Sequence, residues 1–149
     1  MHKARMNAAQ VVPDAYAAIR GVESYLRRSG LEKSLYELVK LRASQINHCA
    51  YCMDMHSRDA RAGGETEQRL YVLGAWRESP LFTKRERAAL AWTECLTRLH
   101  TDGAPDHVYA DLKEQFTETE IANLTVLIGT INLWNRIGVG FNLQHPVVA

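Results

Sequence analysis

The amino-acid sequence predicts an all-helical fold, a bundle of about six to seven helices, and three observations support it. Apolar residues recur three or four positions apart through most of the chain, which is typical of one face of an α-helix. No segment shows the sustained alternation of apolar and polar residues that a half-buried strand requires. The length of 149 residues and the lack of an internal repeat predict a single domain over residues 1–149.

The first two helices are expected in the N-terminal third of the chain. Asp14 can cap the first, whose apolar positions step by four, three and four residues before Gly30 ends it. Ser34 begins the second, in which Leu38 lies on the apolar face and Glu37 lies on the flank. The second helix is therefore predicted to be amphipathic.

A break at Asn47 and His48 separates the second helix from the third, because Asn tolerates turn and left-handed geometry better than most residues. The third helix is expected to open at Cys49 and to run to about Ala62, where two glycines stop it. Its first turn would then carry the cysteines.

Four further helices are expected downstream. The fourth begins at Thr66, and capping boxes that start at Thr83 and Thr117 open the fifth and the seventh. Asp102 and the glycine after it break the fifth helix, and a short sixth helix follows that break. The capping signals therefore divide the C-terminal half into separate helices.

The seventh helix is the most apolar segment of the chain. From Ile121 to Phe141 it is apolar almost all round, which indicates a helix buried at a centre or at an interface. Its polar residues argue against a membrane span, and we expect Asn135 and Arg136 to be held by packing or by an arginine–acid pair. Gly138 and Gly140 are expected to fray or bend its end.

Composition and charge exclude several classes of protein. The net charge of +1 comes without a basic tract, so we expect no nucleic-acid partner. The N-terminus lacks the apolar stretch of a secretory signal, which predicts a cytoplasmic protein with no membrane partner. Three cysteines are too few and too odd in number for a disulfide framework, which leaves redox chemistry, metal binding or burial.

Acid, thiol and imidazole side chains gather in one stretch at spacings that chemistry can use. Cys49 and Cys52 form a C-x-x-C pair, and Glu37 precedes Cys49 by twelve residues. His56 follows Cys52 by four residues, so thiols and imidazole share one side of a helix. A helix N-terminus and a nearby imidazolium both lower the pKa of a thiol from about 8.5, and the thiolate is the nucleophile. The pattern therefore predicts reactive cysteines.

The spacing also predicts a division of roles. Cys52 lies one helical turn from His56, which can act as its base, so we expect Cys52 to attack first. Cys49 lies nearer the helix end, where a partner could reach it, and two cysteines at this spacing can close a reversible disulfide. Glu37 on the preceding helix can orient His56 or relay its proton.

These four residues match the motif E-x11-C-x-x-C-x3-H at every spacing. With the segments LRASQINHCAYCMDMH, FTKRERAALAWTECLT and INLWNR, the chain resembles the alkylhydroperoxidase D-like (AhpD-like) family, which shares its fold with the carboxymuconolactone decarboxylases. The resemblance covers most of the chain from about Leu35 onward. It implies an all-helical subunit that assembles into trimers or hexamers, with a thiol peroxidase site that needs neither metal nor flavin.

The resemblance also implies a catalytic cycle. Cys52 would reduce hydrogen peroxide or an organic hydroperoxide, and Cys49 would resolve the sulfenic acid as a disulfide. His56 and Glu37 would serve as the proton relay, and a dithiol reductant, a lipoyl-bearing protein or a thioredoxin-like donor, would restore the thiols. The chain departs from the founding members at Tyr51, where they carry a histidine, and tyrosine is a poor base near neutral pH.

Other interpretations of the cysteine pair stay open. One is a general dithiol–disulfide oxidoreductase with weak peroxidase activity. Another is a non-enzymatic helical assembly whose cysteines are structural or bind zinc together with His48 and His56, although structural zinc sites usually join two separated ligand pairs. The decarboxylase reaction has no need of a C-x-x-C pair. The third cysteine, Cys95, is expected to be a small buried residue without a catalytic role.

Overall fold

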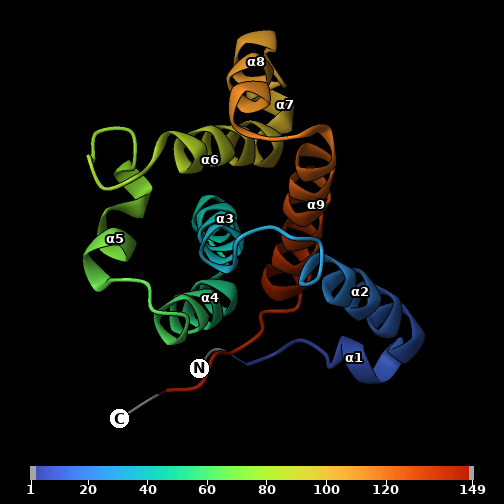
Figure 1. The fold of residues 1–149 in the computed structure, drawn as a ribbon. Coiled ribbons are helices and arrows are strands. Elements are labelled where there is room, and N and C mark those ends of the chain that lie inside the picture. Colours follow the sequence, from blue (N-terminus) through green and yellow to red (C-terminus); the bar gives the residue numbers. More distant parts are fainter. Residues whose placement is uncertain (1–2, 148–149) are drawn as a thin grey trace.

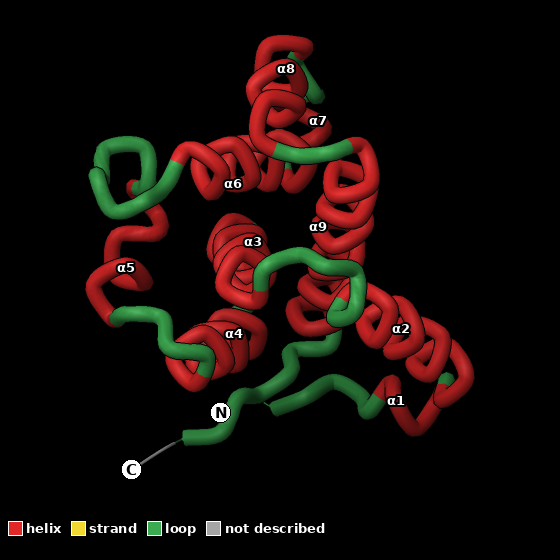
Figure 2. The backbone as a smooth tube through the Cα atoms, viewed as in Figure 1, coloured by secondary structure: helices red, strands yellow, loops and turns green. Residues whose placement is uncertain are grey.

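The computed structural model describes residues 3–147, and every regular element in this part of the chain is helical (Figure 1 and Figure 2). The elements are α1 (Ala8–Val11), α2 (Pro13–Leu26), α3 (Lys33–Ile46), α4 (Ala50–Ala62), α5 (Glu67–Val72), the 3-10 turn η1 (Leu73–Ala75), α6 (Lys84–Thr97), α7 (Leu99–Asp102), α8 (Asp106–Gln115) and α9 (Glu118–Gly140). The predicted all-helical fold is confirmed.

The longer helices agree with those expected from the sequence, and both capping boxes, at Thr83 and Thr117, are formed. The four-residue helices α1 and α7 are additional. Helix α7 is separate from α6 because Arg98 leaves the helical region, with φ −103° and ψ 35°. Asp14 does not cap α2, because Pro13 takes the first helical position and Asp14 lies inside the first turn.

Helix α3 lies at the centre of the fold, with α4, α6 and α9 packed around it (Figure 1). Every residue from Leu35 to Leu41 is buried, and these include the charged Glu37 and Lys40. The flank that carries Glu37 is therefore buried together with the apolar face, because neighbouring helices cover α3 on several sides. Two charged side chains are consequently held in the interior, where each needs a partner.

Two apolar clusters surround α3. The larger one joins α3 to α2, α6, α8 and α9, and contains Leu26, Leu35, Tyr36, Val39, Ala88, Ala89, Trp92, Leu112, Phe116, Ile121, Leu124, Leu127 and Ile128. The smaller one contains Leu38, Leu41, Leu73, Trp76, Phe82 and Leu90. Burial of these apolar side chains supplies the main driving force that holds the helices together.

Helix α9 has a buried face and an exposed apolar face. Leu124, Leu127 and Ile131 are fully buried, whereas Val126 and Leu133 are 45% and 42% exposed. The sequence-based expectation of a helix buried at a centre or an interface is thus met on one face, and the other face is open in the single chain. None of the described helices combines the length and apolarity that a membrane crossing requires.

A polar network ties α9 to the end of α3. Asn135 donates from Nδ2 to Ser44 Oγ at 2.9 Å, and Asn47 donates from Nδ2 to the Oδ1 atoms of Asn132 and Asn135, both at 2.9 Å. Arg136 donates to the carbonyl oxygen and Oδ1 of Asn132, so the expected partner of this arginine, an acid, is replaced by an amide. The network fixes α9 against the turn that precedes the cysteine pair.

Candidate active site

The turn between α3 and α4 is a Schellman motif, which places Cys49. His48 has φ +54°, its N–H donates to the Gln45 carbonyl oxygen at 3.2 Å, and the N–H of Cys49 donates to the Ser44 carbonyl oxygen at 3.0 Å. The predicted break is confirmed, but His48 rather than Asn47 takes the left-handed conformation. The side chain of Asn47 is used instead to bind α9.

Cys49 and Cys52 are joined by a disulfide at the start of α4. Cys49 is the N-cap residue, and its Sγ accepts a hydrogen bond from the N–H of Cys52 at 3.4 Å. The Cα atoms are 5.3 Å apart, within the usual range for a disulfide. The geometry therefore supports a C-x-x-C pair that can be oxidised without rearrangement of the helix.

Both cysteines are buried beneath α9. Cys49 is 1% exposed and Cys52 is 2% exposed. Gly138 is the residue of α9 that lies against them, since a Cβ atom built on it would be 2.7 Å from Cys49 Sγ and 3.4 Å from Cys52 Sγ. Two expectations are corrected here: Cys49 is not open to a partner in this conformation, and Gly138 neither frays nor ends the helix but packs against the sulfurs.

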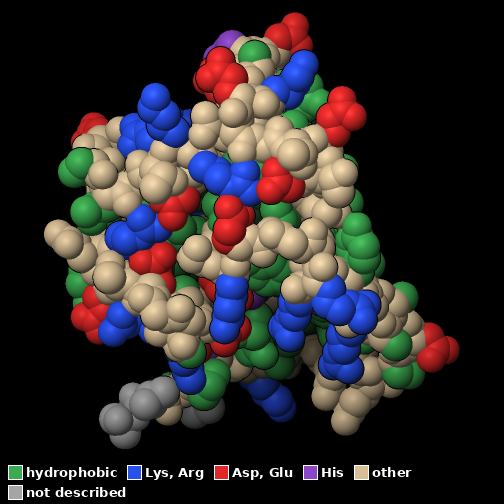
Figure 3. All heavy atoms as spheres, in the orientation of Figure 1, with side chains coloured by type: hydrophobic (Ala, Val, Ile, Leu, Met, Phe, Trp, Pro, Cys, Tyr) green, Lys and Arg blue, Asp and Glu red, His purple; other side chains and the backbone are tan. Residues whose placement is uncertain are grey.

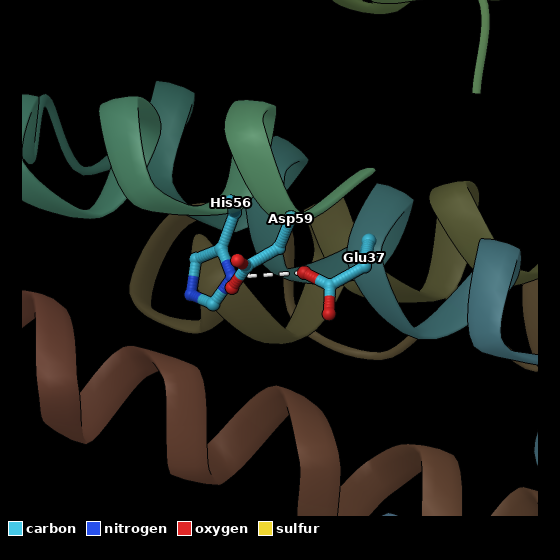
Figure 4. A group of neighbouring side chains, drawn as sticks. All are labelled: Glu37, His56 and Asp59. Carbon is cyan, nitrogen blue, oxygen red and sulfur yellow. Dashed lines mark hydrogen bonds and ion pairs between the residues drawn. The ribbon is translucent and has the colours of Figure 1, made fainter. Parts of the chain in front are cut away.

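Glu37 and His56 form a buried pair beside the disulfide. Nδ1 of His56, on α4, lies 3.0 Å from Oε2 of Glu37, on α3 (Figure 4). Both residues are buried, and His56 is one helical turn beyond Cys52 on the same helix. The structure thus brings all four residues singled out from the sequence to the contact between α3 and α4.

A cavity of about 450 Å³ lies beside Glu37, between the α2–α3 loop, α3 and the last turns of α4. It is lined by Arg27, Leu31, Lys33, Tyr36, Glu37, Asp59 and Ala62. Figure 3 views the molecule from the side of this loop and shows basic side chains gathered there beside α4. Glu37 therefore contacts His56 and also lines a cavity with charged walls.

One group of possible metal ligands is found among the described residues. Glu37, His56 and Asp59 each offer a ligand atom, and these atoms lie within 4.8 Å of one another (Figure 4). Only His56 is shared with the zinc ligands considered from the sequence. The two cysteines of that set are bonded to each other in a disulfide. Basic side chains line the same cavity, and their charge opposes the binding of a cation.

A second ionic group, partly buried and centred on Glu23 of α2, involves Lys40 of the central helix α3. Lys40 Nζ lies 2.7 Å from both carboxylate oxygens, Trp134 Nε1 donates at 3.0 Å, and the Tyr36 hydroxyl also donates. Burial raises the pKa of Glu23, but the charge of Lys40 and these hydrogen bonds outweigh it and leave the pKa lowered. Burial also lowers the pKa of Lys40. The spacing of residues along the sequence does not predict this group, because its members come from three different helices.

Cys95 takes no part in the site. It is a buried residue of α6 and carries a free thiol. Burial raises the pKa of this thiol, and the nearby carboxylate of Asp102 raises it further. A thiol with a raised pKa is a poor nucleophile near neutral pH, in line with the expectation that Cys95 is a small packed residue.

The fold and the site together define a class of protein: a helical bundle with a C-x-x-C disulfide beside a buried carboxylate–imidazole pair. The chain belongs to the carboxymuconolactone decarboxylase family, whose model matches residues 12–94. The matched segment contains the two cysteines, Glu37 and His56, and it ends before α9.

Similar proteins agree with this assignment. An uncharacterised protein of Bacillus subtilis, YdfG, is 38% identical over 135 residues, which cover 91% of this chain and 92% of that protein. A protein of unknown function from Agrobacterium tumefaciens, proposed as an antioxidant defence protein AhpD, is 46% identical in its crystal structure. Its TM-score is 0.95, over 98% of this chain and 100% of that chain.

A more distant structure shows the same fold. A peroxidase-related protein from Ralstonia eutropha JMP134, described as an alkylhydroperoxidase AhpD core, has a TM-score of 0.81 at 18% identity. The similarity covers 93% of this chain and 74% of that chain. The AhpD-like fold inferred from the sequence motif is therefore confirmed.

Proposed function

We propose that this protein is a thiol peroxidase that reduces hydrogen peroxide or organic hydroperoxides through the Cys49–Cys52 pair. The observation that carries the proposal is the disulfide at the start of α4, with the buried Glu37–His56 pair one helical turn away. A redox pair supplies the electrons, and an imidazole held by a carboxylate supplies the proton transfer that peroxide cleavage requires.

The first step oxidises Cys52. His56 accepts the thiol proton, and the thiolate attacks the terminal oxygen of the hydroperoxide, so that an S–O bond forms while the O–O bond breaks. His56 then returns the proton to the departing oxygen, which leaves as water or as an alcohol. Glu37 holds Nδ1 of His56 at 3.0 Å and stabilises the imidazolium formed between the two transfers.

The second and third steps restore the enzyme. The thiolate of Cys49 attacks the sulfur of the Cys52 sulfenic acid, so that the S–S bond forms and the S–O bond breaks, and the hydroxide leaves as water after it takes up a proton. A dithiol reductant then returns two electrons and two protons and becomes a disulfide itself. The lipoyl-bearing or thioredoxin-like donor implied by the family remains part of the proposal. Because both sulfurs are buried, such a donor requires the covering helix to move before it can reduce the disulfide, whereas peroxide oxidation does not.

Burial of the sulfurs favours a peroxide over a protein disulfide as the oxidising substrate. Cys49 and Cys52 are only 1% and 2% exposed, and a folded protein cannot reach either sulfur without movement of the covering helix. A peroxide is small enough to need much less space. We therefore place the peroxidase ahead of a general dithiol–disulfide oxidoreductase.

The exposed apolar side of α9 supports self-association as a further part of the proposal. Val126 and Leu133, seven residues apart and so on one side of this helix, remain 45% and 42% exposed. An apolar helix face is a frequent contact surface between subunits, and a trimer or a hexamer would cover it. Sedimentation of the purified protein measures this directly, and a monomer at micromolar concentration would contradict it.

Stopped-flow peroxide oxidation of the reduced protein tests the mechanism. Cys52→Ser is expected to abolish peroxide consumption, and Cys49→Ser to stop after one oxidation with the sulfenic acid left unresolved. Cys95→Ser is the matched control, since Cys95 is remote in the sequence and carries no role, and it should retain the rate of the natural protein. Peroxide consumption at the full rate by Cys52→Ser would sink the mechanism.

A further inference from the structure

The contact between Gly138 and the two sulfurs points beyond the four motif residues. We propose that Gly138 is a positioning residue of the redox pair, and that its missing side chain sets the balance between the dithiol and the disulfide. The role in turnover rests on the proposed peroxidase function, whereas the balance between dithiol and disulfide is a property of the pair itself. Gly138 lies outside the segment that matches the family model.

Space, and not backbone conformation, explains the glycine at this position. Gly138 lies inside α9, where its backbone is helical and any residue is accepted. A Cβ atom at position 138 would be 2.7 Å from Cys49 Sγ and 3.4 Å from Cys52 Sγ. The same atom on Gly129 or Gly140, in the same helix, would meet nothing within 4 Å. Gly138 is therefore the glycine of α9 whose side chain would collide with the site.

Helix α9 cannot easily retreat from such a collision. The buried Asn135, one turn before Gly138, is bound to Ser44 and to Asn47 at 2.9 Å each. The carbonyl oxygen of Gly138 accepts a hydrogen bond from the N–H of Leu143 at 2.9 Å. The bonds of Asn135 thus hold α9 against the end of α3, the Gly138–Leu143 bond closes the end of α9 itself, and the strain of an added methyl group falls on the sulfur of Cys49.

The disulfide and the dithiol respond differently to this strain. In the disulfide, Cys49 Sγ is bonded to Cys52 Sγ and has no second position. In the dithiol, the side chain of Cys49 is free to rotate to another staggered rotamer and escape the methyl group. A side chain at position 138 should therefore destabilise the disulfide more than the dithiol, and make the pair easier to reduce.

The same contact affects one chemical step selectively. Oxidation of Cys52 to the sulfenic acid needs no bond to Cys49, so it should proceed in a protein with alanine at position 138. Closure of the disulfide requires Cys49 Sγ to occupy the space beside Gly138, with the S–S bond forming as the S–O bond breaks and hydroxide leaves. A methyl group there should slow this closure.

The test compares Gly138→Ala with Gly129→Ala and Gly140→Ala in the full chain. Each variant is equilibrated with buffers of reduced and oxidised dithiothreitol, and the fraction of disulfide is measured by thiol alkylation. We expect Gly138→Ala to shift the equilibrium at least about tenfold toward the dithiol, which corresponds to about 30 mV for a two-electron couple. The two control variants should stay within about twofold, because both methyl groups point into open space.

A second measurement follows the sulfenic acid with dimedone after one equivalent of hydrogen peroxide. Gly138→Ala should accumulate trapped sulfenic acid, whereas the control variants should close the disulfide. An unchanged equilibrium in a folded Gly138→Ala protein would overturn the proposal. If the pair shifts as expected but no variant consumes peroxide, the positioning role stands and the peroxidase function fails.

A double-mutant cycle covers the case in which Gly138→Ala folds poorly. Cys49→Ala removes the sulfur that the methyl group would meet, so Gly138→Ala should cost much less unfolding free energy in that background than in the oxidised natural protein. Equal losses in the two backgrounds, measured by urea unfolding, would show that the methyl group disturbs packing elsewhere and would overturn the proposal.

Discussion

Glu37 of α3 and Glu94 of α6 are both buried glutamates, yet their surroundings differ. Glu94 accepts hydrogen bonds from Arg42 Nε at 2.8 Å, from Trp76 Nε1 at 3.0 Å and from Arg77. Burial raises the pKa of Glu94, but the hydrogen bonds from Arg77, Trp76 and Arg42 outweigh it and leave the pKa lowered. Glu37 has His56 at 3.0 Å and also lines a cavity.

The hydrogen-bond partners distinguish a carboxylate that holds helices together from a carboxylate placed to assist proton transfer. A carboxylate whose oxygens are occupied by fixed cations and an indole N–H stays ionised and holds helices together. A carboxylate bound to an imidazole can stabilise the positive charge that forms when that imidazole accepts a proton. Burial alone does not distinguish the two, whereas the identity of the partners does.

The largest expected effect comes from Glu37→Gln. Glutamine keeps the size of the side chain but removes the charge that stabilises the His56 imidazolium, so oxidation of Cys52 by peroxide should slow about 100-fold. The unfolding free energy should stay within about 1 kcal/mol of the natural value, because an amide oxygen still accepts from His56. Stopped-flow oxidation and urea unfolding measure the two quantities.

Asp54→Asn is the matched control for the loss of a negative charge near the pair. Asp54 also lies on α4, where it pairs with Arg58 at the surface, and such pairs contribute about 0.5 kcal/mol or less. Its oxidation rate should match that of the natural protein. Equal slowing by both variants would mean that net charge, and not the contact with His56, governs the rate.

Glu94→Gln should have the opposite profile. The amide leaves Arg42 without its buried counter-charge, and the unfolding free energy should fall by about 2–3 kcal/mol. Oxidation of Cys52 per folded molecule should be unchanged, because the hydrogen bonds of Glu94 go to Arg42, Trp76 and Arg77 and to none of the site residues. A variant that folds normally but oxidises slowly would break the distinction between the two glutamates.

Acid pH should produce the smallest of these effects and should involve the structural carboxylates. The pKa values of Glu94 and Glu23 are lowered from the ordinary value of 4.5 in the folded protein. Each therefore contributes stability that is present above about pH 4.5 and is lost as the pH falls through its folded pKa. Urea unfolding between pH 7 and pH 3 should show this decline, with a shallower slope in Glu94→Gln.

Local signals predicted much of the fold and the site. The capping boxes at Thr83 and Thr117 were sufficient for two helix starts, because a capping box involves only residues three positions apart. The spacing of Cys49, Cys52 and His56 was sufficient to place them on one helix. These features depend on neighbours in the sequence, so periodicity and motif spacing could reveal them.

Features that depend on distant contacts could not be predicted. The burial of Glu37 follows from the helices that surround α3, and no pattern within α3 records them. The packing of Gly138 against a turn far away in the sequence cannot be predicted from neighbouring residues, and a glycine near a helix end predicts only fraying or bending. The sequence predicts a break at Asn47 and His48 from the tolerance of Asn for turn geometry, but it does not predict that His48 is the residue with the left-handed conformation.

The position of Gly138 on α9 has a consequence for how such a protein can evolve. The residues proposed to handle electrons and protons lie on α3 and α4, whereas the group that limits the space around the sulfurs comes from the last helix. Substitutions in that helix can therefore adjust the oxidising strength of the pair while every reactive side chain is retained. The reactive residues and the residue that adjusts the redox balance are therefore encoded in different segments of the gene, and either can change while the other is retained.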